Sequence, residues 1–439
     1  MRRYIRRHKH QYFQFKKWKT RIIFWGGAVI VGLVAALFAL SADFADQTFH
    51  TIYDRWPVVA FFMTPLGLMF TAWLTRRFFP GAEGSGIPQT IIAIEDRGGP
   101  SLTARLLSIR VAIGKVFLSL IGLFCGASLG REGPTVHIGA AIMYNLGRYT
   151  HLSANYMKRG LILTGGGAGV AAAFNTPLAG IMFAIEELAR EFDRRNIGMI
   201  LIGVILAGMT AISVHQSNYN YYGTVPAEAD LSLLWLAVVV SGVLGGLLGG
   251  GFSQLLIFTG RKIRPYTAKS PYLIAGGLGL IVAVLGVISG GQVFGTGYIE
   301  AQEIVSCTAS SSCENTVDFL YPLYKLAATT ATYLSGIPGG IFAPSLASGA
   351  GLGSDLAILF PASLATTVVL LGMVGYFSGV VQTPVTAFII VMEMVDNQDI
   401  VFALMATSLI ATGASKFVCK KPIYVALAEN FMAALKTHK

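Results

Sequence analysis

Four short segments of the sequence could together bind an anion. Three of them are GSGIP at 84–88, GREGP at 130–134 and GIFAP at 340–344. Glycine and proline at a helix start fix the turn into the helix and leave backbone N–H groups without intrahelical partners. Such donors attract an anion without a full countercharge, so the anion can bind and still leave. The fourth segment ends at Tyr424, whose hydroxyl is a further neutral donor.

Acidic side chains in or beside apolar segments could move protons. Glu132 lies in GREGP, and an ionisable residue inside a membrane span costs at least about 2.5 kcal/mol, which indicates a function. The structural alternative is a salt bridge with Lys115. Glu186 and Glu187 form a second acidic position, with an ordinary charged helix end as the alternative. We expect Arg131 to be structural, paired or facing water, because a fixed buried cation would hold an anion too tightly for turnover.

These residues belong to a chain whose composition suits a lipid bilayer. Of its 439 residues, 54% are hydrophobic and 13% charged, whereas soluble domains are about 25% charged. Apolar stretches long enough to cross about 30 Å of hydrocarbon recur, for example at 21–40, 231–258 and 272–288. The 51 glycines indicate either close helix packing or helices that break inside the membrane and line a solute path. We therefore expect a multi-pass membrane protein.

The net charge of +11 is distributed as in a membrane protein, so we expect no nucleic-acid partner. Basic residues cluster before the first apolar stretch, and later loops alternate in sign, which predicts that both termini are cytoplasmic. We expect no cleavable signal peptide and a location in the bacterial inner (plasma) membrane. The clustered residues are Arg2, Arg3, Arg6, Arg7, Lys9, Lys16, Lys17, Lys19 and Arg21.

A comparison of the chain with itself indicates an internal repeat. A shift of 207 positions aligns residues 165–186 with 372–393, matching a glycine-rich start, a Thr-Pro pair and the acids Glu186 and Glu393. The first half begins its spans on the basic side and the second near Asp230 on the acidic side, so we expect inverted repeats. Inverted repeats place a substrate site near the membrane midplane, where interrupted helices point their N-termini at an anion.

The predicted fold class is an all-α integral membrane protein, with two inverted helical repeats and broken, re-entrant helices around a midplane anion site. We expect five regions along the chain. They are a basic cytoplasmic segment at 1–21, the first repeat at 22–214, an outer linker at 215–230, the second repeat at 231–417 and a cytoplasmic helix carrying Tyr424 at 418–439.

In their order and separation, GSGIP, GREGP, GIFAP and the later Tyr424 resemble the anion-site motifs of the CLC chloride channels and transporters. The resemblance extends from the first apolar stretch through Tyr424. It implies the family's fold and a homodimer with one pore per subunit. Eukaryotic members need a long C-terminal extension for their cytoplasmic domains, and only about fifteen residues follow Tyr424, so we expect a prokaryotic, membrane-only member.

The resemblance also implies how the anion is bound. The hydroxyls of Ser85 and Tyr424 coordinate the central anion with the backbone N–H groups of Ile341 and Phe342, and Gly133 belongs to the same anion-binding set. The structural alternative for Ser85 is an ordinary helix cap. For Tyr424 it is a place in the aromatic belt at the membrane interface.

The resemblance further implies that Glu132 is the gating glutamate, whose carboxylate occupies the outer anion site when charged and swings out when protonated. Glu187 matches the inner glutamate that relays protons in the family's transporters, where channels have an apolar residue. We therefore expect a chloride/proton antiporter. A passive chloride channel is the nearest alternative, and a fluoride-preferring antiporter is the next, which Ser85 in GSGIP disfavours. Pro is absent from position 85, which disfavours a nitrate-preferring variant.

An enzyme is the least favoured reading. An intramembrane hydrolase would need a nucleophile or a metal, and no His pair at metal spacing or Gly-x-Ser-x-Gly segment occurs in the spans. We expect neither a metal nor a cofactor. Cys307 and Cys313 flank a short polar loop, and a disulfide between them is plausible on an oxidising side of the membrane.

Overall fold

The computed structural model describes residues 2–149, 155–190, 197–215, 231–310, 317–395 and 399–437. Within these ranges nearly every residue is helical, and the only extended pairing consists of two isolated bridges, between Gly84 and Pro338 and between Gly130 and Gly340. The all-α fold class predicted from the sequence is confirmed.

The first half of the chain contains helices of very unequal length. A 3-10 turn, η1, covers Pro57–Val59, and a π-helical segment, η2, covers Ala184–Ala189. The α-helices are α1 (Arg2–Arg55), α2 (Ala60–Phe78), α3 (Ile87–Ile94), α4 (Gly99–Leu106), α5 (Ile109–Phe124), α6 (Glu132–Gly147), α7 (Asn155–Phe174), α8 (Pro177–Phe183) and α9 (Ile197–His215).

The second half contains one 3-10 turn, η3, at Ala362–Leu364. Its α-helices are α10 (Leu231–Lys269), α11 (Pro271–Ile288), α12 (Tyr298–Ser310), α13 (Tyr321–Leu334), α14 (Phe342–Ala357), α15 (Ala365–Val381), α16 (Pro384–Met394), α17 (Val401–Val418) and α18 (Ile423–Thr437).

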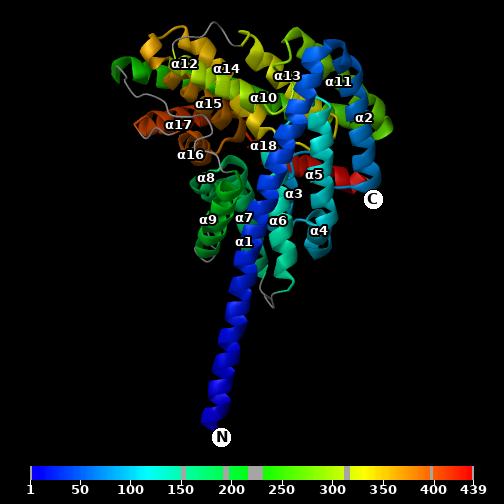
Figure 1. Cartoon of the computed structure of the whole chain (residues 1–439), viewed down its shortest axis with the longest axis vertical. Helices are drawn as coiled ribbons and strands as arrows, with labels where there is room; N and C mark the ends of the chain where they lie inside the picture. The colour runs from blue at the N-terminus through cyan, green and yellow to red at the C-terminus, as the bar shows by residue number, and fades with distance from the viewer. Residues whose placement is uncertain are drawn as a thin grey trace.

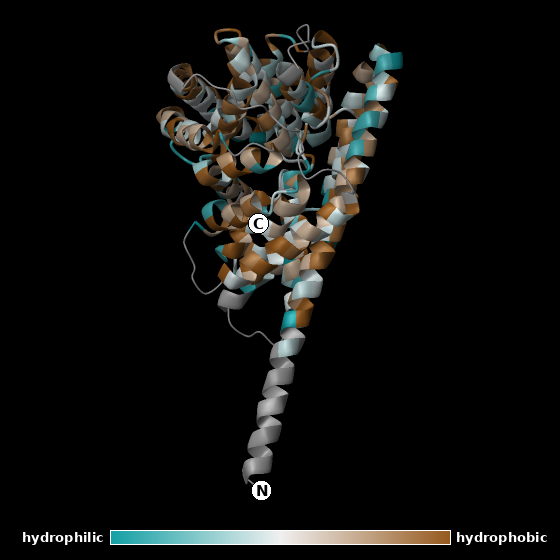
Figure 2. Cartoon of the chain, turned by 60° about the vertical axis from the view of Figure 1, so that its left-hand side comes forward, coloured by the Kyte–Doolittle hydropathy of each residue, from teal (hydrophilic) through white to brown (hydrophobic). Residues whose placement is uncertain are grey.

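Eight stretches among the described residues are long and apolar enough to cross a membrane. Large apolar side chains such as Phe62, Leu273 and Phe402 are exposed on the surface, as expected for residues that face lipid. Figure 2 shows apolar residues along the outer helices and along the part of α1 that lies against the body. The stretches are Arg21–Arg55, Pro57–Phe78, Gly99–Phe124, Ile197–Val214, Leu233–Lys269, Pro271–Ile288, Ala362–Val381 and Val401–Val418.

Helix α1 is continuous from the basic N-terminal segment into the first span, and Figure 1 shows it projecting well beyond the rest of the molecule. Helix α15 lies at the centre of the fold. In its membrane-spanning stretch 94% of the residues are buried, whereas in that of α11 only 28% are. Helix α18 packs back against α3 and α10. The C-terminal helix is therefore part of the folded body.

The Thr-Pro pairs matched by the repeat break two helices in the same way. Helix α7 ends before Asn175, which has a φ of 58°, and α8 begins at Pro177. Helix α15 ends before Gln382, with a φ of 59°, and α16 begins at Pro384. A left-handed residue ends one helix, and proline suits the first position of the next. The exact boundaries of the two repeats remain a prediction.

Glycines in both halves allow helix backbones to touch. A Cβ added to Gly139 of α6 would lie 2.1 Å from the carbonyl oxygen of Gly165 of α7, and one on Gly372 of α15 would lie 2.4 Å from the Cα of Gly353 of α14. No side chain fits either position. Close packing and helix breaks, which we gave as alternatives, therefore both occur.

The disulfide prediction concerns Cys307 and Cys313. Cys307 is disulfide-bonded, and Cys313 lies outside the described residues. Cys125 and Cys419 are free and buried.

Candidate functional site

Backbone hydrogen bonds bring three of the four sequence segments together. Gly130 and Gly340 each donate an N–H to the other's carbonyl, and both N···O distances are 2.7 Å. Gly84 donates to the carbonyl of Ile337 at 3.2 Å and accepts from the N–H of Gly339 at 3.3 Å. The starts of α3, α6 and α14 are thereby held at one place, although they are far apart in the sequence.

Ser85 lies at the contact between α3 and α6. Its side chain is buried, and its Oγ accepts a hydrogen bond from the N–H of Ile87 at 3.3 Å. A Cβ on Gly133 would lie 2.7 Å from this oxygen, so only glycine lets the start of α6 approach it. The N-cap of α3 is Gly86, so Ser85, one residue earlier, is not an ordinary N-cap, although its Oγ accepts from the first N–H of the helix. The hydroxyl proton stays available, because no acceptor for it is recorded among the described residues.

Tyr424 lies at the start of α18 and is fully buried. Its ring stacks on that of Phe342, with centroids 5.7 Å apart and planes 16° from parallel. The aromatic-belt alternative is wrong, because a belt residue would be exposed at the membrane interface. The phenol oxygen has no hydrogen-bond partner among the described residues. A buried hydroxyl without a protein partner is able to donate a hydrogen bond to a bound anion.

The start of α14 supplies the backbone donors. Ile341 is its N-cap and Phe342 its first residue, and both are buried. Backbone N–H groups in the first turn of a helix have no intrahelical acceptor. The N–H of the next residue, Ala343, donates to Oε2 of Glu132 at 3.3 Å. The N-terminus of α14 therefore faces the acidic residue that begins α6.

Glu132 is fully buried between these helix starts. Its Oε1 accepts a hydrogen bond of 2.6 Å from the hydroxyl of Tyr298, in addition to the bond from Ala343 to Oε2. A Cβ on Gly130 would lie 2.4 Å from Oε2, so the glycine leaves room for the carboxylate. The structure places a carboxyl group where two helix N-termini converge, a place where their dipoles favour its charged form.

The salt bridge considered between Glu132 and Lys115 is wrong. Lys115 Nζ instead donates to the carbonyls of Ala82 at 2.7 Å and Gly84 at 2.8 Å, in the loop that precedes Ser85. The lysine holds the loop and not the acid.

Arg131 is paired, as expected for a structural residue. It is fully buried, and its Nη1 donates to Asp43 Oδ1 at 2.5 Å and to the carbonyl of Ala39 at 2.9 Å. Its guanidinium carbon also lies 5.0 Å from the centre of the Tyr298 ring. Its charge is therefore directed toward α1 and α12.

The two acids at the end of α8 have different environments. Glu187 is buried in η2; its Oε1 accepts from Arg190 Nη2 at 3.2 Å, and its Oε2 has no hydrogen-bond partner among the described residues. Glu186 instead accepts from the N–H groups of Val385 at 3.2 Å and Thr386 at 2.7 Å. The charged-helix-end alternative therefore describes Glu186, which caps α16, better than Glu187.

Glu393, which the repeat aligns with Glu186, makes the corresponding contact in the other direction. Its carboxylate accepts from the N–H groups of Leu178 at 3.1 Å and Ala179 at 2.8 Å, at the start of α8. Each acid thus caps the broken helix of the opposite half. The two halves are braced against each other close to Glu187.

Aromatic rings lead from Glu132 toward Glu187. The ring of Tyr298 contacts that of Phe174, with centroids 6.4 Å apart, and Phe174 lies 6.2 Å from Phe342. Phe342 in turn lies 5.8 Å from Phe183, four residues before Glu187. The two buried carboxylates are linked by apolar contacts.

Sequence reasoning did not find Tyr298, which touches Glu132 directly. A signal exists: Gly295, Thr296 and Gly297 repeat the spacing of Gly84, Ser85 and Gly86 at a shift of 211 positions, just before Tyr298. The shift differs from the 207 that aligns the Thr-Pro pairs, so one fixed offset does not reveal both.

The fold is shared with solved transporters. Over 94% of this chain and 97% of the other, it matches a slow cyanobacterial Cl⁻/H⁺ antiporter with a TM-score of 0.80 and 24% identity. A CLC-type fluoride/proton antiporter matches 92% of this chain over 96% of its own, with a TM-score of 0.76 and 23% identity. A eukaryotic CLC transporter matches 93% of this chain over 74% of its own, with a TM-score of 0.70 and 19% identity.

At these identities the likeness establishes the fold. The family model described as voltage gated chloride channel matches residues 66–416, which include the three glycine-rich segments and both buried acids. The chain therefore belongs to the voltage gated chloride channel family, the CLC family of membrane transport proteins.

Proposed function

We propose that this protein exchanges chloride for protons across a membrane. The observation that carries the proposal is a pair of buried carboxylates with different partners. Glu132 lies between the N-termini of α6 and α14, and Glu187 keeps one oxygen without a hydrogen-bond partner among the described residues. A passive anion path would need only the first of them.

In this proposal the Glu132 carboxylate and chloride compete for the same donors. A charged carboxylate accepts from Ala343 and holds the outer position. Protonation removes its charge, so the helix N-termini favour chloride in its place. Below it, chloride is coordinated by the hydroxyls of Ser85 and Tyr424 and by the N–H groups of Ile341 and Phe342.

Glu187 receives the proton on its way between Glu132 and the cytoplasm. In this proposal chloride does not follow this route, whose apolar surroundings include the rings of Phe174, Phe342 and Phe183. An ionisable side chain is an effective relay in such apolar surroundings. Separate routes that meet at Glu132 couple the two ions.

The anion is chloride in this proposal. Ser85 stands in the GSGIP segment, and one structural relative is a chloride/proton antiporter. A fluoride/proton antiporter has the same fold, so fluoride is the competing anion. Exchange assays with each anion at equal concentration distinguish them. Faster proton-coupled flux with fluoride than with chloride would identify fluoride as the substrate.

One assay tests the coupling itself. The protein is reconstituted in liposomes, and the reversal potential is measured under opposed chloride and proton gradients. An antiporter reverses between the two equilibrium potentials, at a value set by its stoichiometry. Reversal at the chloride equilibrium potential would identify a passive channel.

We also propose that two copies form a homodimer in a bacterial inner (plasma) membrane, with both termini in the cytoplasm. The basic residues that precede the first span support this orientation. Exposed apolar side chains supply surface for contact between copies. Cross-linking in mild detergent tests the dimer, and labelling of cysteines introduced near each terminus tests the orientation.

A further inference from the structure

Tyr298 connects the gate carboxylate to a second part of the molecule. Its hydroxyl donates to Glu132 Oε1 at 2.6 Å, across 166 positions of sequence, and its side chain is buried. A hydrogen bond from a neutral donor to a carboxylate is stronger than one between neutral groups. The contact therefore favours the charged form of Glu132 over the protonated form.

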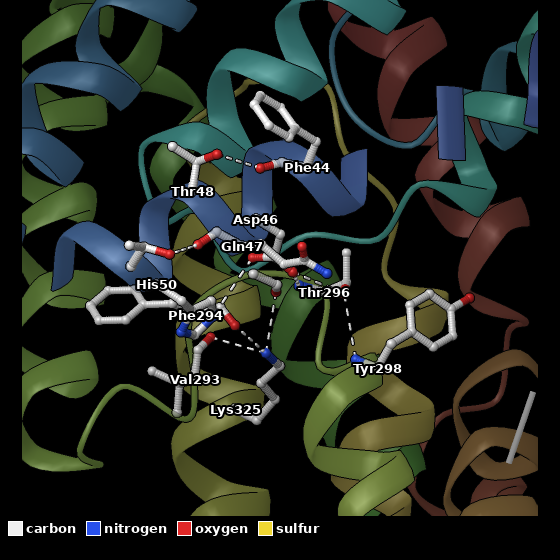
Figure 3. A network of polar contacts seen from close by, with 12 residues as sticks. Phe44, Asp46, Gln47, Thr48, His50, Val293, Phe294, Thr296, Tyr298 and Lys325 are labelled. Atoms are coloured by element: carbon white, nitrogen blue, oxygen red, sulfur yellow. Dashed lines mark hydrogen bonds and ion pairs between the residues drawn. The ribbon is translucent and has the colours of Figure 1, made fainter. Parts of the chain in front are cut away.

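The position of Tyr298 is fixed by the loop that precedes α12. Its backbone N–H donates to Thr296 Oγ1 at 3.4 Å, and both the N–H and the hydroxyl of Thr296 donate to Asp46 Oδ2 at 3.2 Å. Figure 3 shows Asp46 of α1 above this loop, with Thr296 and Tyr298 beside it. A helix from the start of the chain thus anchors the residue that holds the gate.

A buried lysine holds the same loop from the other side. Lys325 Nζ donates to the carbonyls of Val293, Phe294 and Gly295, at 3.1, 2.9 and 3.2 Å. The N–H of the next residue, Thr296, donates to Asp46 of α1. Tyr298 then begins α12 with its hydroxyl on Glu132.

The loop before Ser85 has the same construction in the first half. Gly84 and Gly86 have φ angles of 63° and 97°, compared with 62° and 85° for Gly295 and Gly297. Lys115 caps the first loop as Lys325 caps the second. The two loops differ at the two positions that are not glycine. Thr296 replaces Ser85, and Tyr298 replaces Ile87.

We propose that the second loop is a gate-positioning device, in which Tyr298 stabilises the charged, site-occupying form of Glu132 and so sets the pH at which chloride replaces it. This inference rests on the proposed role of Glu132 as the gate. In this proposal the first loop presents the hydroxyl of Ser85 to the anion. The second loop places the phenol of Tyr298 on the Glu132 carboxylate, which competes with the anion.

Two other charged or titratable side chains among the described residues act on Glu132, namely Arg131 at the N-cap of α6 and Tyr424 of α18. Arg131 forms a salt bridge with Asp43. Helix α14 contributes the N–H of Ala343. The Tyr298 hydroxyl on α12 bonds directly to the carboxylate, so its removal takes away a hydrogen bond to Glu132 itself.

The test is the pH dependence of chloride flux in liposomes carrying Tyr298→Phe. The substitution removes the phenol and keeps the ring. The carboxylate becomes easier to protonate, so the flux should reach half its maximum at a pH about one unit higher than in the wild type. Chloride binding measured by calorimetry at high pH should become several-fold tighter, because the competing carboxylate is held less firmly.

Tyr53→Phe is the matched control. It also removes a buried phenol, whose hydroxyl donates to the carbonyl of Gly286 at 3.4 Å, and it should leave the pH profile unchanged. In a Glu132→Gln background, Tyr298→Phe should cause no further shift in the pH profile. An unchanged midpoint in the single variant, or an equal shift in the Glu132→Gln background, would overturn the proposal.

The two proposals fail in distinguishable ways. If wild-type flux is passive, the exchange mechanism is wrong, but a shift caused by Tyr298→Phe that requires Glu132 still assigns Tyr298 to the gate. If exchange is coupled and the shift is absent, the gate-positioning role alone is wrong.

Discussion

The loops before Ser85 and before Tyr298 share a backbone and differ in use. Both have left-handed glycines on either side of a hydroxyl residue, and both are capped by a buried lysine from the following long helix. In the first loop the hydroxyl of Ser85 has no acceptor recorded among the described residues, whereas in the second Asp46 accepts from Thr296. The two loops therefore combine one backbone geometry with two different hydroxyl environments.

Removal of the Glu132 carboxylate should have the largest effect on transport. We expect Glu132→Ala to keep chloride flux and to abolish proton coupling, because no carboxylate remains to compete with chloride or to carry a proton. The pH dependence of flux should flatten, which radiotracer uptake at several pH values measures. Uphill proton pumping by this variant would show that the gate lies elsewhere.

The next largest effect separates the two acids at the end of α8. Glu187→Gln should still move chloride down its gradient but should reverse at the chloride equilibrium potential, because the proton relay is lost. Its control is Glu186→Gln, which should stay coupled and lose about 1 kcal/mol of stability, since Glu186 caps α16. Full coupling in Glu187→Gln would direct the proton along another route.

Substitution of the two corresponding hydroxyl residues, Ser85 and Thr296, should have smaller effects. Ser85→Ala should weaken chloride binding about tenfold, as expected for a hydrogen bond to a charged group. Tyr424→Phe should act in the same direction. Thr296→Val should not weaken chloride binding and should instead raise the pH of half-maximal flux, by less than Tyr298→Phe does. Calorimetry with chloride gives the affinities, and equal losses in the Ser85 and Thr296 variants would remove the distinction between the loops.

The smallest functional effects should come from the two lysines. Lys115→Met should reduce chloride affinity roughly threefold, and Lys325→Met should shift the pH of half-maximal flux by about half a unit, which is a threefold change in proton concentration. Each loop then loses its lysine but keeps its other contacts. Both variants should melt at lower temperature in detergent, since the carbonyls that each ammonium group binds lose that donor. Identical functional changes in the two variants would mean that the lysines only stabilise the fold.

Much of the fold could be predicted from local sequence. The spans follow from runs of apolar residues, and the breaks before α8 and α16 follow from the Thr-Pro pairs, because proline and the residue before it restrict the backbone wherever they occur. The glycine-rich segments that begin α6 and α14 were recognisable for the same reason. Their glycines leave room for close approach, since a Cβ on Gly130 would lie 2.4 Å from Glu132 Oε2 and one on Gly133 would lie 2.7 Å from Ser85 Oγ.

Side-chain partners could not be predicted in this way. Lys115 is near Glu132 in sequence, yet it binds the carbonyls before Ser85, and Glu186 and Glu187 are adjacent but have unrelated environments. Sequence spacing does not say which of several buried acceptors a charged group will satisfy. That choice depends on which helix ends the tertiary structure brings within reach.

The sequence by itself determined the membrane environment, the repeat and the segments that contain Ser85, Glu132 and Phe342. Only the tertiary structure decided that Tyr298 bonds to Glu132 and that Glu186 and Glu393 cap helices of opposite halves. The physical reason is that helix breaks and apolar spans are set by neighbouring residues, whereas buried polar groups must find partners wherever the packed fold supplies them. For these three contacts the partners lie 166, 200 and 214 positions away.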